Sequence, residues 1–108
     1  MFERKPPIRS TQEDVAELAE DLDRFVVHLA ERIDAIQDAE LVKNWSEIAS
    51  LARTLANDAD RLGYPGMAQS AKSVAMAAED SKTDAIQDTV VELTDLAQRV
   101  RRGHRSAA

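Results

Sequence analysis

Residues 44–64 read NWSEIASLARTLANDADRLGY, and this stretch has the pattern of one complete α-helix. Asn44 is a favoured N-cap residue, and Glu47 stands three positions later, where it completes a capping box. Gly63 follows the last turn, where a left-handed residue ends many helices. Apolar residues recur every three or four positions, as in a helix packed lengthwise on others. This stripe consists of Trp45, Ile48, Ala52, Leu55, Ala59 and Leu62.

The opposite side of the same helix is polar. Its residues recur with the same spacing, so they share one face, and Arg53 lies at the middle of that face. The members of the polar face are Ser46, Ser50, Arg53, Asn57 and Asp60. A solvated helix face and a binding face both have this pattern, so the role of Arg53 is open at this point.

A long helix is predicted before residues 44–64. It begins at Ser10 and Thr11, with Glu13 in its first turn, and runs to about Glu40. The same three and four spacing continues along it through Val15, Leu18, Leu22, Phe25, Leu29, Ile33 and Ile36.

Two more helices are predicted after the break at Gly63-Tyr64-Pro65-Gly66. One covers residues 66–80 and is rich in alanine, so it is expected to approach a neighbour closely. The last has Thr83 as its N-cap and ends near Arg102, before Gly103.

The composition favours helices throughout. The chain has 108 residues, of which 44% are hydrophobic, with only three Gly and three Pro. This length supports one core and one domain. Four helices with short connections and one apolar stripe each predict an all-α fold, an antiparallel up-down-up-down four-helix bundle over residues 10–102. Residues 1–9, which contain adjacent prolines, and residues 103–108 are expected to be flexible.

The charge is unevenly distributed. Seven of the 14 basic residues but only one of the 20 acidic residues lie outside residues 10–98, so the formal charge of −6 becomes −12 for that segment. Such a surface repels a phosphate backbone, so no nucleic-acid partner is expected. The C-terminal arginines have a simpler reading as complements of the negative end of a helix dipole. No apolar run approaches the roughly 20 residues of a membrane span, and a cytoplasmic location with no membrane partner is expected.

The sequence offers no basis for catalytic, metal or cofactor chemistry. It contains no cysteine, no phosphate loop, no HExxH motif and no nucleophile elbow. A di-iron site in a bundle needs Glu-x-x-His pairs, and neither His28 nor His104 has a glutamate three residues before it. The acidic residues of the first helix are expected to form a solvated face, and they include Glu17, Glu20, Asp21, Asp34 and Asp38.

Residues 52–59, Ala-Arg-Thr-Leu-Ala-Asn-Asp-Ala, followed by Leu62-Gly63 and an alanine-rich helix, resemble the histidine-containing phosphotransfer (HPt) domain. The resemblance covers roughly residues 15–102. In that family the second bundle helix carries Ala-His-Thr/Ser-Leu-Lys-Gly-Ser-Ala, and a Leu-Gly pair follows it. The family's exposed histidine takes a phosphoryl group from a receiver-domain aspartate, its lysine helps to neutralise the phosphate, and its glycine leaves room for the receiver.

The chain departs from the family at each of these functional positions. Arg53 stands in place of the histidine, Ala56 in place of the lysine, and Asn57 in place of the glycine. A guanidinium stays protonated near neutral pH and has no free lone pair to attack phosphoaspartate. The resemblance therefore implies a degenerate HPt domain that is not an enzyme.

Two functions are consistent with this pattern. The resemblance implies a non-catalytic signalling module of a two-component system that binds a receiver domain or a histidine kinase without carrying phosphate. Its partner-binding residues would be Ser46, Ser50, Arg53, Thr54, Ala56 and Asn57. The alternative is a structural or adaptor bundle whose partner is another helix or a second copy of the chain. A monomer is expected, with weak pairing of two copies under the alternative.

Overall fold

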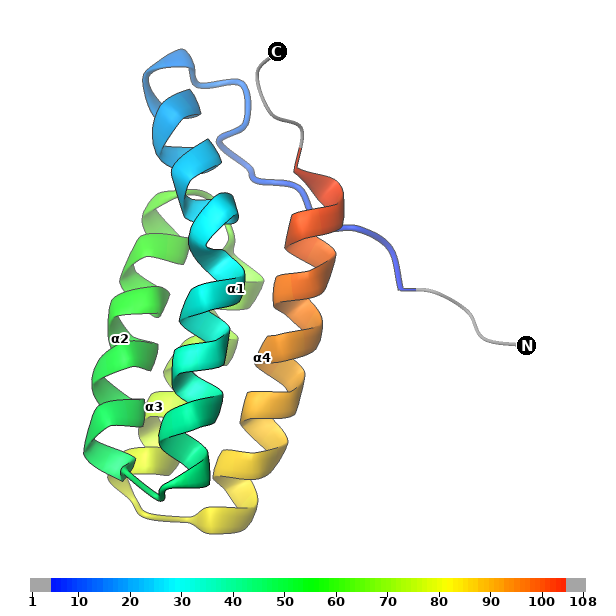
Figure 1. Ribbon diagram of the computed structural model, residues 1–108. Coiled ribbons are helices and arrows are strands. Elements are labelled where there is room, and N and C mark those ends of the chain that lie inside the picture. Colours follow the sequence, from blue (N-terminus) through cyan, green and yellow to red (C-terminus); the bar gives the residue numbers. More distant parts are fainter. Residues whose placement is uncertain (1–4, 105–108) are drawn as a thin grey trace.

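The computed structural model describes residues 5–104, and within them it contains four α-helices and no strand. A short 3-10 helix, η1 (Ala16–Leu18), leads into α1 (Ala19–Leu41). The chain continues through α2 (Trp45–Arg61), α3 (Pro65–Glu79) and α4 (Thr83–Gly103). The predicted all-α class is confirmed. Each helix packs against its neighbours in sequence, and α1 also packs against α4 (Figure 1).

The central helix follows its sequence pattern closely. The side-chain oxygen of Asn44 accepts a hydrogen bond from the Glu47 amide at 3.1 Å, which confirms the N-cap. The apolar stripe of α2 is buried at 0–1% exposure from Ile48 to Leu62, while Trp45 at its start is half-buried. The prediction for α3 was one residue late, because Pro65 occupies the first helical position, where its missing N–H costs nothing.

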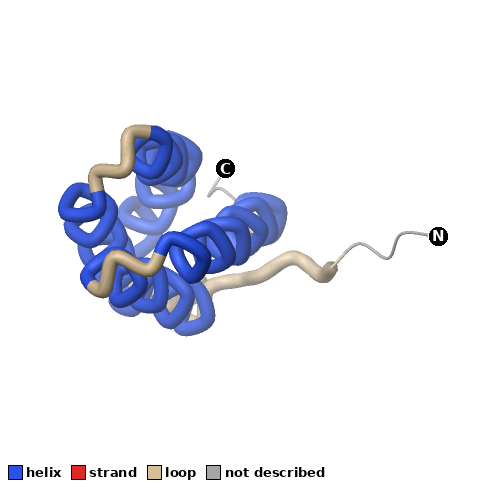
Figure 2. The backbone as a smooth tube through the Cα atoms, turned by 90° about the horizontal axis from the view of Figure 1, so that it is seen from below, coloured by secondary structure: helices blue, strands red, loops and turns tan. Residues whose placement is uncertain are grey.

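All three helix connections have the same conformation. In each, the middle residue is left-handed: Lys43 at φ 57°, Gly63 at φ 86° and Ser81 at φ 54°. The next amide then bonds back to a carbonyl five residues earlier, as in Tyr64 N to Ala59 O at 2.8 Å. Only Gly63 carried a sequence signal for this turn. Figure 2 shows the α1–α2 and α3–α4 connections together at one end of the molecule.

The core is a single apolar cluster shared by the four helices. Alanine supplies much of it on α2 and α3, which lets those helix backbones lie close together. Phe25 of α1 stacks on Tyr64 with ring centroids 5.8 Å apart. These two rings fill the end of the core nearest the α2–α3 connection.

The first predicted helix begins nine residues later than expected. Ser10 does not cap it, because the Ser10 hydroxyl is buried and donates to the backbone carbonyl of Leu62. The amide of Thr11 donates to Gly63 O at 2.9 Å. Ser10 and Thr11, which were predicted to start the helix, instead attach the N-terminal segment to the α2–α3 connection.

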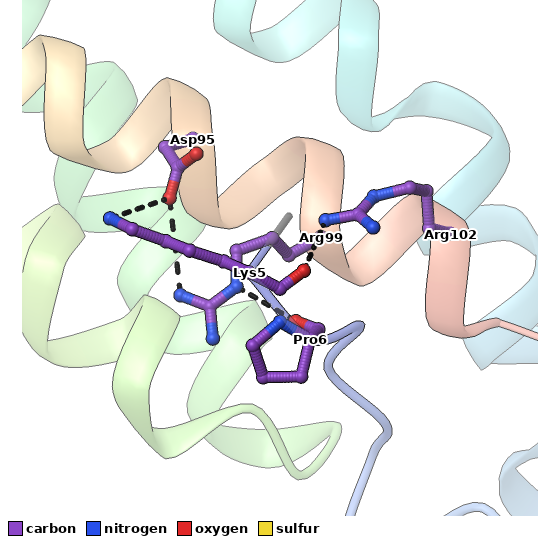
Figure 3. A network of polar contacts seen from close by, with 5 residues as sticks. All are labelled: Lys5, Pro6, Asp95, Arg99 and Arg102. Atoms are coloured by element: carbon purple, nitrogen blue, oxygen red, sulfur yellow. Dashed lines mark hydrogen bonds and ion pairs between the residues drawn. The ribbon is translucent and has the colours of Figure 1, made fainter. Parts of the chain in front are cut away.

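Lys5 and Pro6, from the N-terminal segment predicted to be flexible, lie against α4 (Figure 3). The Ile8 amide donates to the backbone carbonyl of Arg99 at 3.0 Å. The Arg99 side chain donates to Pro6 O at 2.9 Å, and Arg102 donates to Lys5 O at 2.9 Å. Two C-terminal arginines therefore bind the N-terminal segment, a role beyond the predicted dipole effect.

Gly103 and His104, the last described residues, also contact other parts of the chain. Gly103 is the last residue of α4 and is buried, and the His104 Nε2 lies 2.6 Å from a carboxylate oxygen of Asp23 in α1. At the start of α4, Thr83 is the first helical residue and Lys82 is the N-cap, so the predicted Thr83 cap was wrong. The remaining parts of the predicted arm and tail, residues 1–4 and 105–108, lie outside the described residues.

Candidate docking face

The predicted partner-binding residues share the second helix. Five of them are exposed on α2 and form one strip along it: Ser46, Ser50, Arg53, Thr54 and Asn57. Ala56 is different, because its side chain is only 1% exposed and belongs to the core. Its inclusion among the exposed partner-binding residues is therefore corrected. The position that holds lysine in the HPt pattern faces inward in this chain.

Arg53 is held by an ion pair between helices. Its guanidinium makes two hydrogen bonds to the carboxylate of Glu79, the last residue of α3; the bond from Nε measures 3.3 Å. Both side chains are about half exposed, at 51% and 46%. The hydrogen bond to Glu79 and its negative charge raise the pKa of Arg53 above the usual value. Arg53 therefore stays cationic and is held toward α3, with its other edge open to solvent.

A shallow hollow lies beside the exposed strip, between α1 and α2. Its volume is about 300 Å3, and Ser50 and Thr54 form part of its wall. The Thr54 hydroxyl donates to Ser50 O at 3.1 Å, within the helix. We call this the serine–threonine hollow, and its lining residues are Glu31, Arg32, Ala35, Ser50, Leu51 and Thr54.

A second hollow of about 240 Å3 continues along the same helix pair and shares Arg32 with the first. We call it the arginine hollow. The carboxylate of Asp21 accepts from Arg24 at 3.3 Å and from Arg61 at 3.1 Å, while Asp58 accepts from Arg32 at 2.9 Å. Its lining residues are Asp21, Arg24, Phe25, His28, Arg32, Asp58, Arg61 and Leu62.

Sequence reasoning missed the arginine hollow. Asp21 was assigned to a solvated acidic face, yet it bridges two arginines from different helices. Arg61 lies 40 positions from Asp21, and Arg32 lies 26 positions from Asp58. No local spacing could join these residues, because the contacts depend on how α1 and α2 are rotated against each other.

A third hollow, of about 200 Å3, lies where the N-terminal segment crosses the end of the bundle. Tyr64, Ser10 and the His104–Asp23 pair contribute to its lining. Burial and the nearby carboxylate of Glu13 raise the pKa of Tyr64 to about 12. These residues hold the two ends of the described chain against the core.

The guanidinium of Arg53, at the centre of the exposed strip of α2, has no lone pair for nucleophilic attack. Within residues 5–104 no three His, Cys, Asp or Glu side chains are grouped to hold a metal ion. In the same described segment, none of the helices has both the length and the apolar run required to cross a bilayer. The exposed strip is a polar surface that carries the Arg53–Glu79 ion pair, and two shallow hollows lie beside it.

Comparison of this chain with protein-family models, with curated proteins and with solved structures finds no match. The family resemblance of residues 15–102 therefore stays a prediction from the sequence motif in α2.

Proposed function

We propose that this chain is an HPt-like docking module that binds a receiver domain of a two-component system without carrying phosphate. The observation that carries this proposal is the strip of five polar residues on α2, centred on an arginine at the position of the family's histidine. A histidine kinase segment is the second partner that the resemblance allows.

The arrangement of the helices supports the proposal. We infer an antiparallel up-down-up-down bundle of the HPt type. Figure 1 shows the α2–α3 connection at one end and the other two connections at the opposite end. Each connection has only three residues, which suits antiparallel neighbours.

Arg53 suits contact with a receiver domain. The phosphorylation pocket of a receiver is a cluster of carboxylates, and a guanidinium forms charge-assisted hydrogen bonds to such groups. Glu79 occupies one edge of Arg53 and fixes its position on the surface. A guanidinium has five N–H donors, so donors remain for a partner.

The test is titration of the protein with receiver domains encoded in the same genome, with binding measured by calorimetry. Arg53→Gln and Glu79→Gln form a matched pair, because each breaks the same intramolecular ion pair but only the first removes the cation. The proposal expects Arg53→Gln to weaken binding about tenfold or more and Glu79→Gln to leave binding intact or tighter. Arg53→Glu is expected to abolish it.

Equal effects of the two variants would show that Arg53 only joins α2 to α3. Incubation with a phosphorylated receiver domain is expected to give no acid-labile phosphoprotein. Formation of such a product would contradict the assignment of Arg53 as a group that does not accept phosphate.

A structural or adaptor role is the alternative. It is favoured by the two large apolar side chains exposed side by side in sequence at the end of α1, Leu41 at 82% and Val42 at 74%. A stable dimer in analytical ultracentrifugation that Leu41→Ser together with Val42→Ser dissociates would support this role over receiver docking.

A further inference from the structure

The arginine hollow concentrates positive charge on an otherwise acidic body. Residues 10–98 contain seven basic side chains against 19 acidic ones. Three of these seven line the hollow: Arg24 and Arg32 from α1 and Arg61 from α2. With Asp21 and Asp58 the lining has a formal charge of +1 when His28 is neutral. This local sign is opposite to that of the whole chain.

The three guanidiniums retain capacity to bind another acceptor. Each uses one terminal nitrogen in its bond to Asp21 or Asp58. Since a guanidinium has five N–H donors, the other donors of each side chain have no hydrogen-bond partner within residues 5–104. The side chains of Arg24 and Arg61 are 67% and 54% exposed, so an acceptor from outside can reach them.

The hollow is also held in shape before any ligand arrives. Arg32 is only 27% exposed, and its guanidinium carbon lies 5.8 Å from the centroid of the Phe25 ring. The cation–π contact and the Asp58 pair hold Arg32 in position. Arg24 and Arg61 share the single carboxylate of Asp21, which keeps these two cations close together. Less side-chain entropy is then lost on binding.

We propose that the arginine hollow binds carboxylate side chains of an acidic protein segment. A single carboxylate matches the local charge of +1, and its planar pair of oxygens fits the edge of a guanidinium. The overall charge of −6 does not prevent this, because the Debye length of about 8 Å at physiological ionic strength screens distant charges.

A role for the arginine hollow in receiver binding rests on the proposed function. Arg61 lies eight residues from Arg53 on α2, or about 12 Å along the helix at about 1.5 Å per residue. The serine–threonine hollow lies between α1 and α2 and joins the arginine hollow at Arg32. A receiver domain seated on α2 with its pocket at Arg53 would therefore also cover the arginine hollow, where a carboxylate on that part of its surface could bind.

The first experiment uses an acetylated hexaglutamate peptide as the probe and the full chain. Titration is followed by NMR of the arginine Nε–Hε groups. Shifts concentrated at Arg24, Arg32 and Arg61 are expected, and they should be lost at about 1 M ionic strength, where the Debye length is about 3 Å. The double variant Arg24→Gln/Arg61→Gln should weaken peptide binding at least fivefold. Lys72→Gln, which removes an exposed positive charge from α3, should leave it unchanged.

Peptide shifts spread evenly over all arginines, or equal binding by the double variant, would overturn the proposal. Circular dichroism and thermal unfolding of the variants establish that both are folded. A second titration, with a receiver domain that binds the unmodified chain, separates the two proposals. If receiver binding is lost in Arg53→Gln but not in Arg24→Gln/Arg61→Gln, the docking function is supported and the arginine hollow takes no part in it. Peptide binding without any receiver binding retains the acidic-segment site and overturns receiver docking.

Discussion

Gly63 occupies a backbone position that no other residue fits without strain. Its φ of 86° lies in the left-handed region, and a Cβ there would stand 2.6 Å from Ser10 Oγ and 2.8 Å from the Gln12 amide. Gly63→Ala is therefore expected to lower the free energy of unfolding by about 2 kcal/mol or more. Urea denaturation measures this change.

Gly66 provides the matched control for that substitution. It lies in the first turn of α3, and a Cβ built there meets nothing within 4 Å. Gly66→Ala is expected to stabilise the protein by about 0.5 kcal/mol, since alanine has the higher helix propensity. If both variants lost stability equally, the crossing of the N-terminal segment over Gly63 would not be the cause.

Tyr64 is expected to make the free energy of unfolding depend on pH in the alkaline range. Desolvation of the buried phenol, together with the Glu13 carboxylate, raises its pKa from the usual 10.0 to about 12. Between these two values the unfolded chain loses the phenol proton while the folded chain keeps it. Stability therefore falls as pH rises through this interval, by up to about 1.4 kcal/mol per pH unit.

The measurement is the difference in unfolding free energy between the unmodified chain and Tyr64→Phe, followed from about pH 9 to about pH 12. The phenylalanine variant retains the ring but cannot ionise, so the difference isolates the phenol from the titration of lysines. Parallel curves for the two proteins over this range would contradict a raised pKa for Tyr64.

At the scale of elements, residues 5–11 form a strap, a segment that is hydrogen-bonded across α4 and the α2–α3 connection. The amides of Ile8 and Thr11 donate to Arg99 O and Gly63 O, so we expect both to exchange slowly with solvent. The Arg9 amide between them makes no hydrogen bond within residues 5–104 and should exchange fast. Hydrogen exchange followed by NMR compares the three amides directly.

Arg99→Ala tests how the strap is held. It removes the side-chain bond to Pro6 O and keeps the backbone acceptor for Ile8. Exchange at Ile8 is expected to become about fivefold faster, as the loss of roughly 1 kcal/mol implies. Arg101→Ala is the control, because Arg101 is exposed on the same helix and makes no polar contact within the described residues. Equal exchange at Ile8 in the two variants would contradict the role of Arg99.

At the scale of the whole molecule, close packing of the helices decides which residues can serve the docking face. The HPt pattern has lysine at position 56, where this chain has a buried alanine. Ala56→Lys is expected to destabilise the protein by more than about 2 kcal/mol, because the ammonium loses its hydration inside the core. Thermal unfolding measures the effect.

Asn57→Lys is the matched control, since it places the same side chain one residue later at an exposed position. Its effect should stay within about 0.5 kcal/mol. A tolerated lysine at position 56 would show that the core can open there and that the family's lysine could be restored without cost.

Most of the candidate docking face follows from the pattern of α2 alone. Ser46, Ser50, Arg53, Thr54 and Asn57 are exposed because they lie away from the apolar stripe, and a helical period of 3.6 residues places them there. The pairing of Arg53 with Glu79 does not follow from it. That contact joins residues 26 positions apart and depends on the register between α2 and α3.

The amino-acid sequence by itself determined the four helices, the buried stripe of α2 and its cap at Asn44, because periodicity and capping are local properties of the chain. Only the tertiary structure decided the grouping of arginines in the arginine hollow and the use of Ser10 as a tertiary donor to Leu62. These features arise where segments distant in sequence meet, and the rotation and register of helices that set such contacts are not encoded in any single helical pattern.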